Sequence, residues 1–157
     1  MKGNKKVIAA LNALLADELA ARDQYFIHSR MLSEWGLSRA AERIAHEMED
    51  ETAHADALIR RILFLEGVPA MTPAKLTIGK DLPDIFSKDL AVEMVVVKNL
   101  REAIALCETE QDYVSREILE KMLDDTEEDH AHWLEQQLGL IKLVGLQNYL
   151  QSQMDHD

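Results

Sequence analysis

The chain has 157 residues, enough for one compact domain with a full apolar core. Its 17 Lys and Arg against 29 Asp and Glu give a formal net charge of −12, which argues against nucleic acid and anionic membranes as partners and favours cations. The single cysteine, Cys107, excludes an intramolecular disulfide, and no apolar run is long enough to span a bilayer. The N-terminus lacks the apolar stretch of a signal peptide, so we expect a cytoplasmic protein.

Glycine and proline divide the first half of the chain into two long helical segments. Residues 4–35 contain neither residue type, and Gly36 followed by Ser38 predicts a helix end and the N-cap of the next helix. The second helix is expected over residues 39–66. Residues 67–83 hold three prolines and two glycines without any period, which predicts a long crossover.

The second half repeats this arrangement. A third helix is expected from Pro83, a residue type suited to a first helical turn, to about Glu108. A short turn should end at a capping Asp112, from which a fourth helix runs to Gly139 or a little beyond. Residues 146–150 predict one short extra helix. The whole chain, residues 1–157, is therefore expected to be a single all-α domain.

Each long segment carries an apolar stripe with steps of three and four residues, which is typical of helix bundles packed at shallow angles. In every stripe a glutamate occupies a core position, and these are Glu18, Glu51, Glu93 and Glu127. An unpaired carboxylate in a dry core is very costly. Four such residues therefore require a counter-charge.

Two of the glutamates are followed three residues later, on the same helix face, by His54 and His130. Folding each helical hairpin back on itself brings its glutamates to one level, roughly 24 Å from the turn at about 1.5 Å per residue. Two single glutamates and two Glu-x-x-His pairs form the ligand set of di-iron and di-manganese carboxylate bundles. Four carboxylates balance two divalent ions, and oxygen-rich ligation with imidazole suits iron or manganese.

Other candidates have a functional and an ordinary interpretation. Tyr25 lies two turns from Glu18 on the same stripe, where it either packs or takes a redox role. His46, Glu47 and Asp50 are expected to be part of a solvated acidic face, although residues one turn apart also suit an iron ion.

Motifs along the whole chain carry a family resemblance: Asp23-Gln-Tyr-Phe-Ile-His28, Glu51-x-x-His54-Ala-Asp56, Lys98-Asn-Leu-Arg-Glu-Ala-Ile104, Asp112-Tyr-Val-Ser-Arg116 and Gly145-Leu-Gln-Asn-Tyr-Leu150. On these motifs the sequence resembles the bacterioferritins. The resemblance implies a ferritin-like four-helix bundle with a long crossover between the second and third helices and a short fifth helix. It also implies a hollow cage of 24 subunits that stores ferric mineral.

The resemblance further implies roles for individual residues. The ferroxidase ligands would be Glu18, Glu51, His54, Glu93, Glu127 and His130, holding two iron ions per subunit that are oxidised with O2 or H2O2. Glu51 and Glu127 would bridge the ions. His46 and Asp50 match an inner-surface iron site, and Tyr25, with Trp133 as a weaker match, corresponds to residues implicated in electron transfer.

One position departs from the haem-binding members of the family. They carry a methionine directly after the first bridging glutamate, where this chain has Thr52. The sequence is similar to haem-poor bacterioferritin and bacterial ferritin subunits in Ala21–Tyr25 and Thr126–His130. We therefore expect little or no haem in the homo-oligomer, and co-assembly with a haem-binding paralogue stays open.

Two other functions stay open on the sequence alone. A stand-alone di-iron peroxidase of the rubrerythrin type would share the bundle chemistry, but such proteins usually carry a cysteine-rich iron domain, which one cysteine cannot supply. A plain helical interaction module would bind no iron.

Overall fold

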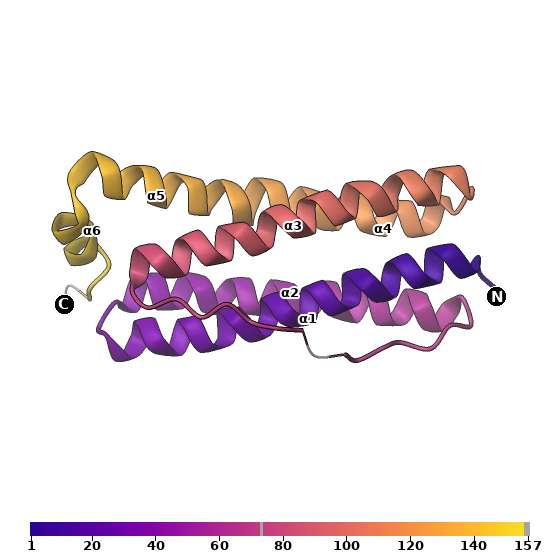
Figure 1. Ribbon diagram of the computed structural model, residues 1–157, viewed down its shortest axis with the longest axis horizontal. Helices are drawn as coiled ribbons and strands as arrows, with labels where there is room; N and C mark the ends of the chain where they lie inside the picture. The colour runs from indigo at the N-terminus through magenta and orange to yellow at the C-terminus, as the bar shows by residue number, and fades with distance from the viewer. Residues whose placement is uncertain (73, 156–157) are drawn as a thin grey trace.

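The computed structural model describes residues 1–72 and 74–155, and its regular structure there is helical. Two antiparallel helical hairpins lie side by side (Figure 1). The first consists of α1 (Lys5–Glu34) and α2 (Ser38–Phe64), and the second of α3 (Leu82–Thr109) and a composite fourth helix. That fourth helix is continuous through α4 (Tyr113–Asp124), the π-helix η1 (Asp125–Ala131) and α5 (His132–Val144). No helix of the described residues is both long and apolar enough to cross a membrane.

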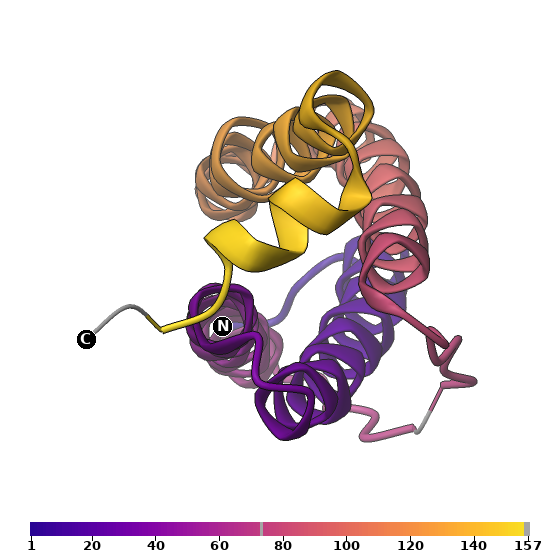
Figure 2. The same ribbon diagram turned by 90° about the vertical axis from the view of Figure 1, so that its left-hand side faces the viewer.

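The two hairpins are joined by the long crossover that the prolines and glycines predict, which runs along the length of the bundle (Figure 1). The expected short helix is also present, as α6 (Leu146–Ser152), and it lies across one end of the bundle (Figure 2). Its Tyr149 is buried against the edge of Phe86, and the Tyr149 hydroxyl donates a hydrogen bond to Gln137 Oε1 at 2.6 Å. This helix is therefore anchored on its own subunit.

Side chains fix several of the helix starts. Asn4 Oδ1 accepts hydrogen bonds from the backbone N–H groups of the first turn of α1, and Asp81 and Asp112 do the same for α3 and α4. The expected capping role of Ser38 is wrong. Ser38 is the first residue of α2, and Leu37 precedes it without a side-chain cap. The turn between α1 and α2 instead depends on Gly36, whose φ of 80° is a left-handed backbone conformation that is unfavourable for other residue types.

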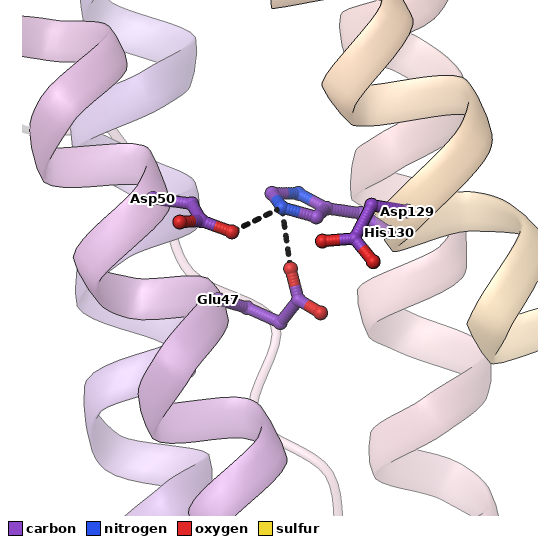
Figure 3. Close-up of side chains that lie close together, drawn as sticks. All are labelled: Glu47, Asp50, Asp129 and His130. Carbon is purple, nitrogen blue, oxygen red and sulfur yellow. Dashed lines mark hydrogen bonds and ion pairs between the residues drawn. The ribbon is translucent and has the colours of Figure 1, made fainter.

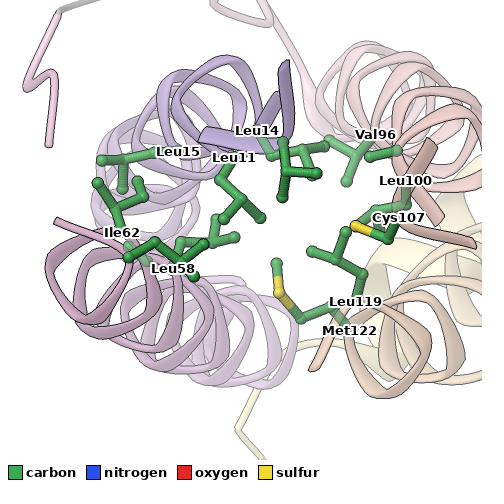
Figure 4. Close-up of a cluster of buried hydrophobic side chains, with 14 of the residues drawn as sticks. Leu11, Leu14, Leu15, Leu58, Ile62, Val96, Leu100, Cys107, Leu119 and Met122 are labelled. Carbon is green, nitrogen blue, oxygen red and sulfur yellow. The ribbon is translucent and has the colours of Figure 1, made fainter. Parts of the chain in front are cut away.

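The apolar core consists of two clusters that leave a layer between them. One cluster contains Leu11, Leu58, Leu100 and Leu119, with one leucine from each bundle helix, and these side chains point toward a common centre (Figure 4). The other contains Ile44, Phe86 and Leu134 at the opposite end of the bundle. Each fully buried leucine or phenylalanine side chain contributes about 1.5–3 kcal/mol. The bundle can therefore carry polar residues in the layer between the clusters.

Candidate metal centre

Five of the six predicted iron ligands lie in the layer between the two apolar clusters. Each has at most 6% of its surface exposed, and they are Glu18, Glu51, His54, Glu93 and His130. The side chains come from α1, α2, α3 and η1, so the site forms only when both hairpins are folded together.

The five side chains form two trios that share Glu51. In the first trio, His54 Nδ1 lies 3.4 Å from Glu18 Oε2 and 3.6 Å from Glu51 Oε2. In the second, His130 Nδ1 lies 2.9 Å from Glu51 Oε1 and 3.6 Å from Glu93 Oε1. Within each trio, one ligand atom from every residue lies within 4.8 Å of the others. One carboxylate between two such trios is suited to bridge two metal ions.

Several ligand atoms in this layer are buried without hydrogen bonds. Within the described part of the chain, no aligned hydrogen bond is formed by Glu18 Oε1, either carboxylate oxygen of Glu51, Glu93 Oε2 or His130 Nδ1. Buried polar atoms in native proteins are almost always paired, because leaving one unpaired costs about 1–3 kcal/mol. The unpaired atoms all belong to residue types that bind iron, so the donor set fits two metal ions.

Burial and the neighbouring charges act in opposite directions on protonation at this site. Burial raises the pKa of Glu93, and the nearby His130 ring only partly offsets this effect. For Glu51, burial is outweighed by the nearby His130 and His54 rings, which lower its pKa. Burial also opposes charge on both histidines, yet their carboxylate neighbours raise the pKa of each. Protons thus neutralise the metal-free centre, and metal ions that bind neutral imidazole must displace them.

The sixth predicted ligand, Glu127, does not share the buried layer. The sequence pattern assigns it a core position, but its side chain is 35% exposed and pairs with Arg101 of α3. The reason is local: residues 125–131 form a π-helix, whose wider turn breaks the regular 3.6-residue spacing that the prediction assumed. Glu127 lines a surface hollow of about 260 Å³ together with Arg101. Its role as a ligand remains a prediction.

Tyr25 lies at the edge of the metal centre. It is almost fully buried, and its hydroxyl donates a hydrogen bond to Glu93 Oε1. The tyrosine therefore packs in the core and also contacts a predicted iron ligand, so the two sequence interpretations are compatible. Trp133 and Phe86 pack edge to face, with ring centroids 5.4 Å apart, and Arg43 Cζ lies over the Trp133 ring at 4.8 Å from its centroid.

Carboxylates outside the predicted set contact the outer nitrogen of each histidine. His54 Nε2 lies 3.0 Å from Asp125 Oδ2, and His130 Nε2 lies 2.5 Å from Glu47 Oε2. Such a contact orients each ring so that its Nδ1 faces the glutamates of the layer, where it could bind a metal ion. The sequence analysis missed Asp125 and took Glu47 for a solvated residue. The spacing of Glu47 four residues before Glu51, on the same helix face, was the available signal.

The predicted inner-surface pair lies close to this centre on α2. His46 Nε2 is 3.7 Å from Asp50 Oδ2, and both residues reach the surface of the single chain. Asp50 also lies 3.1 Å from His130 Nε2. A cavity of about 420 Å³ opens beside Asp50, His54 and Asp125. The cavity therefore reaches His54 of the histidine layer.

A second buried polar group ties the crossover to the bundle. His28 Nδ1 lies 2.8 Å from Asp89 Oδ1, and His28 Nε2 accepts a hydrogen bond from the Gly79 N–H at 2.9 Å. Gln24 donates to the same carboxylate oxygen at 2.9 Å. Since Nε2 is an acceptor, a neutral His28 must carry its proton on Nδ1 and donate it to Asp89. This group fixes the crossover and is separate from the metal layer.

The architecture and the carboxylate–histidine layer define a ferritin-like protein with a candidate dinuclear metal centre. The ferritin-like domain model matches residues 8–144. Over 155 residues the chain is 60% identical to the bacterial ferritin of Synechocystis sp., covering 98% of this chain and 99% of that protein. It is 59% identical to the bacterial ferritin of Pseudomonas aeruginosa, covering 98% and 100%. It is 41% identical to the bacterioferritin of Mycobacterium leprae, covering 95% and 94%.

These similarities extend over nearly the whole chain and well exceed what fold similarity alone requires. The chain therefore belongs to the bacterioferritin and bacterial ferritin family.

Proposed function

We propose that this chain is the subunit of an iron-storage cage that oxidises Fe(II) to Fe(III) at its own dinuclear centre. The observation that carries the proposal is the pair of buried ligand trios sharing Glu51, in which several ligand atoms lack any other partner. A ferritin-family subunit has no structural need for such a costly layer unless it binds cations there. Iron storage is the function that family membership supports.

Each residue has a distinct role in binding Fe(II) as substrate. Glu18 and His54 hold one ion, Glu93 and His130 hold the other, and Glu51 bridges them. The three buried carboxylates supply three negative charges against the four positive charges of two Fe(II) ions. Glu127 supplies the fourth when it leaves Arg101 and turns inward. Charge balance therefore favours its movement once the second ion arrives.

The redox step transfers two electrons from a pair of Fe(II) ions to the oxidant. With O2 and two protons the products are two Fe(III) and one H2O2, and with H2O2 and two protons they are two Fe(III) and two water molecules. The proton-loaded histidines provide protons near the oxidant when iron displaces them. Tyr25, in contact with Glu93, is placed to take part in electron transfer at this centre.

Storage requires assembly, and the single chain exposes apolar side chains suited to subunit contacts. Leu63, Phe64 and Met71 are each more than half exposed near one end of the bundle, and Phe26 is 50% exposed on α1. Large exposed apolar side chains at several places on one small domain favour burial against other copies. We propose the 24-subunit cage on this ground together with family membership, with His46 and Asp50 as an iron site on its inner surface. Membership does not favour the stand-alone peroxidase.

The test is the initial rate of aerobic Fe(II) oxidation by Glu127→Ala and His130→Ala variants. Both should lose rapid oxidation while they keep the helical content and the assembled mass of the parent, because neither residue belongs to the two apolar clusters that hold the bundle together. His132→Ala is the matched control, since this exposed histidine lies two residues from His130. A Glu127→Ala variant at the parental rate would exclude Glu127 as a ligand. Parental rates in both variants would exclude the centre.

A further inference from the structure

Three carboxylates surround the outer nitrogen of His130. Glu47 Oε2 lies 2.5 Å from His130 Nε2, and Asp50 Oδ2 lies 3.1 Å from the same atom (Figure 3). Asp129, the residue before His130, contributes the third carboxylate. One ligand atom from each of the four residues lies within 4.8 Å of the others. We call these residues the outer cluster. It faces away from the dinuclear centre, because His130 Nδ1 is the atom that contacts Glu51.

Glu47 is the residue that distinguishes the outer cluster from an ordinary acidic surface. Only 3% of its surface is accessible to solvent. Its Oε1 accepts a hydrogen bond from Arg43 Nε at 2.7 Å. Its Oε2 approaches the His130 ring without the alignment of a hydrogen bond, and no other donor among the described residues reaches it. This buried carboxylate oxygen is therefore paired by charge only with the His130 ring, and a bound cation would supply the partner that it lacks when that ring is neutral.

The charge of the outer cluster is also incompletely balanced. Among the described residues, Arg43 is the arginine that the ion pairs place at the cluster, and its guanidinium also donates a hydrogen bond to Asp129 Oδ1 at 2.8 Å. Three carboxylates and one guanidinium leave two negative charges when His130 is neutral. The other half of the bundle differs, because His54 Nε2 contacts the single carboxylate of Asp125. One carboxylate is sufficient to orient a histidine, so the additional carboxylates beside His130 need another explanation.

We infer that the outer cluster is a third cation site, which binds a divalent first-row metal ion through Glu47, Asp50 and His130 Nε2, with Asp129 beside them. Oxygen ligands with one imidazole suit Fe(II), Mn(II) or Co(II), and a charge of +2 neutralises the group. The site lies beyond the proposed dinuclear centre. It also differs from the inner-surface pair, because it requires Glu47 and does not require His46.

The two sites share His130 in a defined way. A neutral imidazole has a lone pair on only one ring nitrogen, so His130 ligates through Nδ1 or through Nε2. An ion in the complete outer site therefore leaves His130 unavailable to the dinuclear centre. The outer site should bind most tightly when that centre is empty or impaired.

The experiment uses this competition. We would measure the number of Co(II) ions bound per chain by equilibrium dialysis of the assembled full-length protein. Co(II) replaces Fe(II) here because it resists oxidation by air. The background is Glu18→Gln/Glu93→Gln, which impairs the dinuclear centre with uncharged residues of the same shape. In this background we expect one ion per chain to remain, and anomalous diffraction should place it between Glu47, Asp50 and His130. Adding Glu47→Gln should weaken its binding by at least tenfold.

Two further variants serve as controls. Asp56→Asn removes an exposed carboxylate from the same helix, and His46→Ala removes the inner-surface histidine. Both should retain the ion. The inference is overturned if Glu47→Gln leaves the remaining ion in place, or if the background variant binds no ion while the parent binds two. In the latter case the proposed dinuclear centre still stands. If the proposal of the dinuclear centre is itself wrong, the parent protein will bind no ion at Glu51, the residue that the two trios share.

Discussion

The exposed pair between Arg101 and Glu127 should limit how tightly the dinuclear centre binds its second ion. If Glu127 is the sixth ligand, its carboxylate must leave Arg101 before it can reach the metal. The Arg101 side chain is 65% exposed and that of Glu127 is 35% exposed, so water screens the pair strongly. Pairs of this kind contribute about 0.2–1 kcal/mol. Arg101→Gln should therefore raise the affinity for the second ion by up to about fivefold, since 1.4 kcal/mol corresponds to tenfold.

The measurement is a Co(II) titration by calorimetry, with Arg60→Gln as the matched control. Arg60 also forms an exposed ion pair, with Asp56 at 2.7 Å, and its loss changes the net charge equally. Any general attraction of cations by the more negative chain therefore appears in both variants and is reduced by salt. The reasoning is refuted if Arg101→Gln and Arg60→Gln bind the second ion equally well. Weaker binding in Arg101→Gln would show that Arg101 assists Glu127.

Three other predictions concern stability, reactivity and haem. Asp112 caps α4 and pairs with Arg61 at 2.8 Å. Burial opposes its ionisation, but hydrogen bonds from Ser115 and Arg61 outweigh that effect and lower its pKa. Asp112→Ala should lower the free energy of unfolding by about 1–2 kcal/mol. The difference in the free energy of unfolding between variant and parent, measured with urea, should be constant above about pH 5 and shrink below about pH 4. The reason is that the capping and pairing contacts of Asp112 stabilise the fold only while its carboxylate is ionised. Burial raises the pKa of the Cys107 thiol from 9.0 to about 11, so alkylation at pH 8 should be roughly a hundredfold slower than in the urea-unfolded chain. Comparable rates would show that this side chain is accessible. Finally, the exposed Thr52 hydroxyl donates to the Met48 carbonyl oxygen at 2.9 Å and offers no axial ligand for haem iron. The purified homo-oligomer, expressed with ample haem, should show no strong Soret band, and one haem per two subunits would contradict this.

The helices and most residues of the candidate metal centre could be predicted from the sequence alone. Gly36, Pro83 and Asp112 mark boundaries because their effects on the backbone are local. Steps of three and four residues identify the buried face of each helix, since side chains four apart share one side. Glu18, Glu51 and Glu93 could be identified for this reason, as buried carboxylates on otherwise apolar stripes.

The positions that depend on contact between distant helices could not be predicted in this way. Glu127 follows the helical spacing of its stripe, yet a π-helical turn and Arg101 of another helix place its carboxylate at the surface. Glu47 belongs to an acidic face of α2, yet in the folded chain it is buried beside His130 of the opposite hairpin. Sequence spacing determines which side chains share a face. The tertiary structure alone determines which charges from separate helices meet, because those contacts depend on how the two hairpins pack.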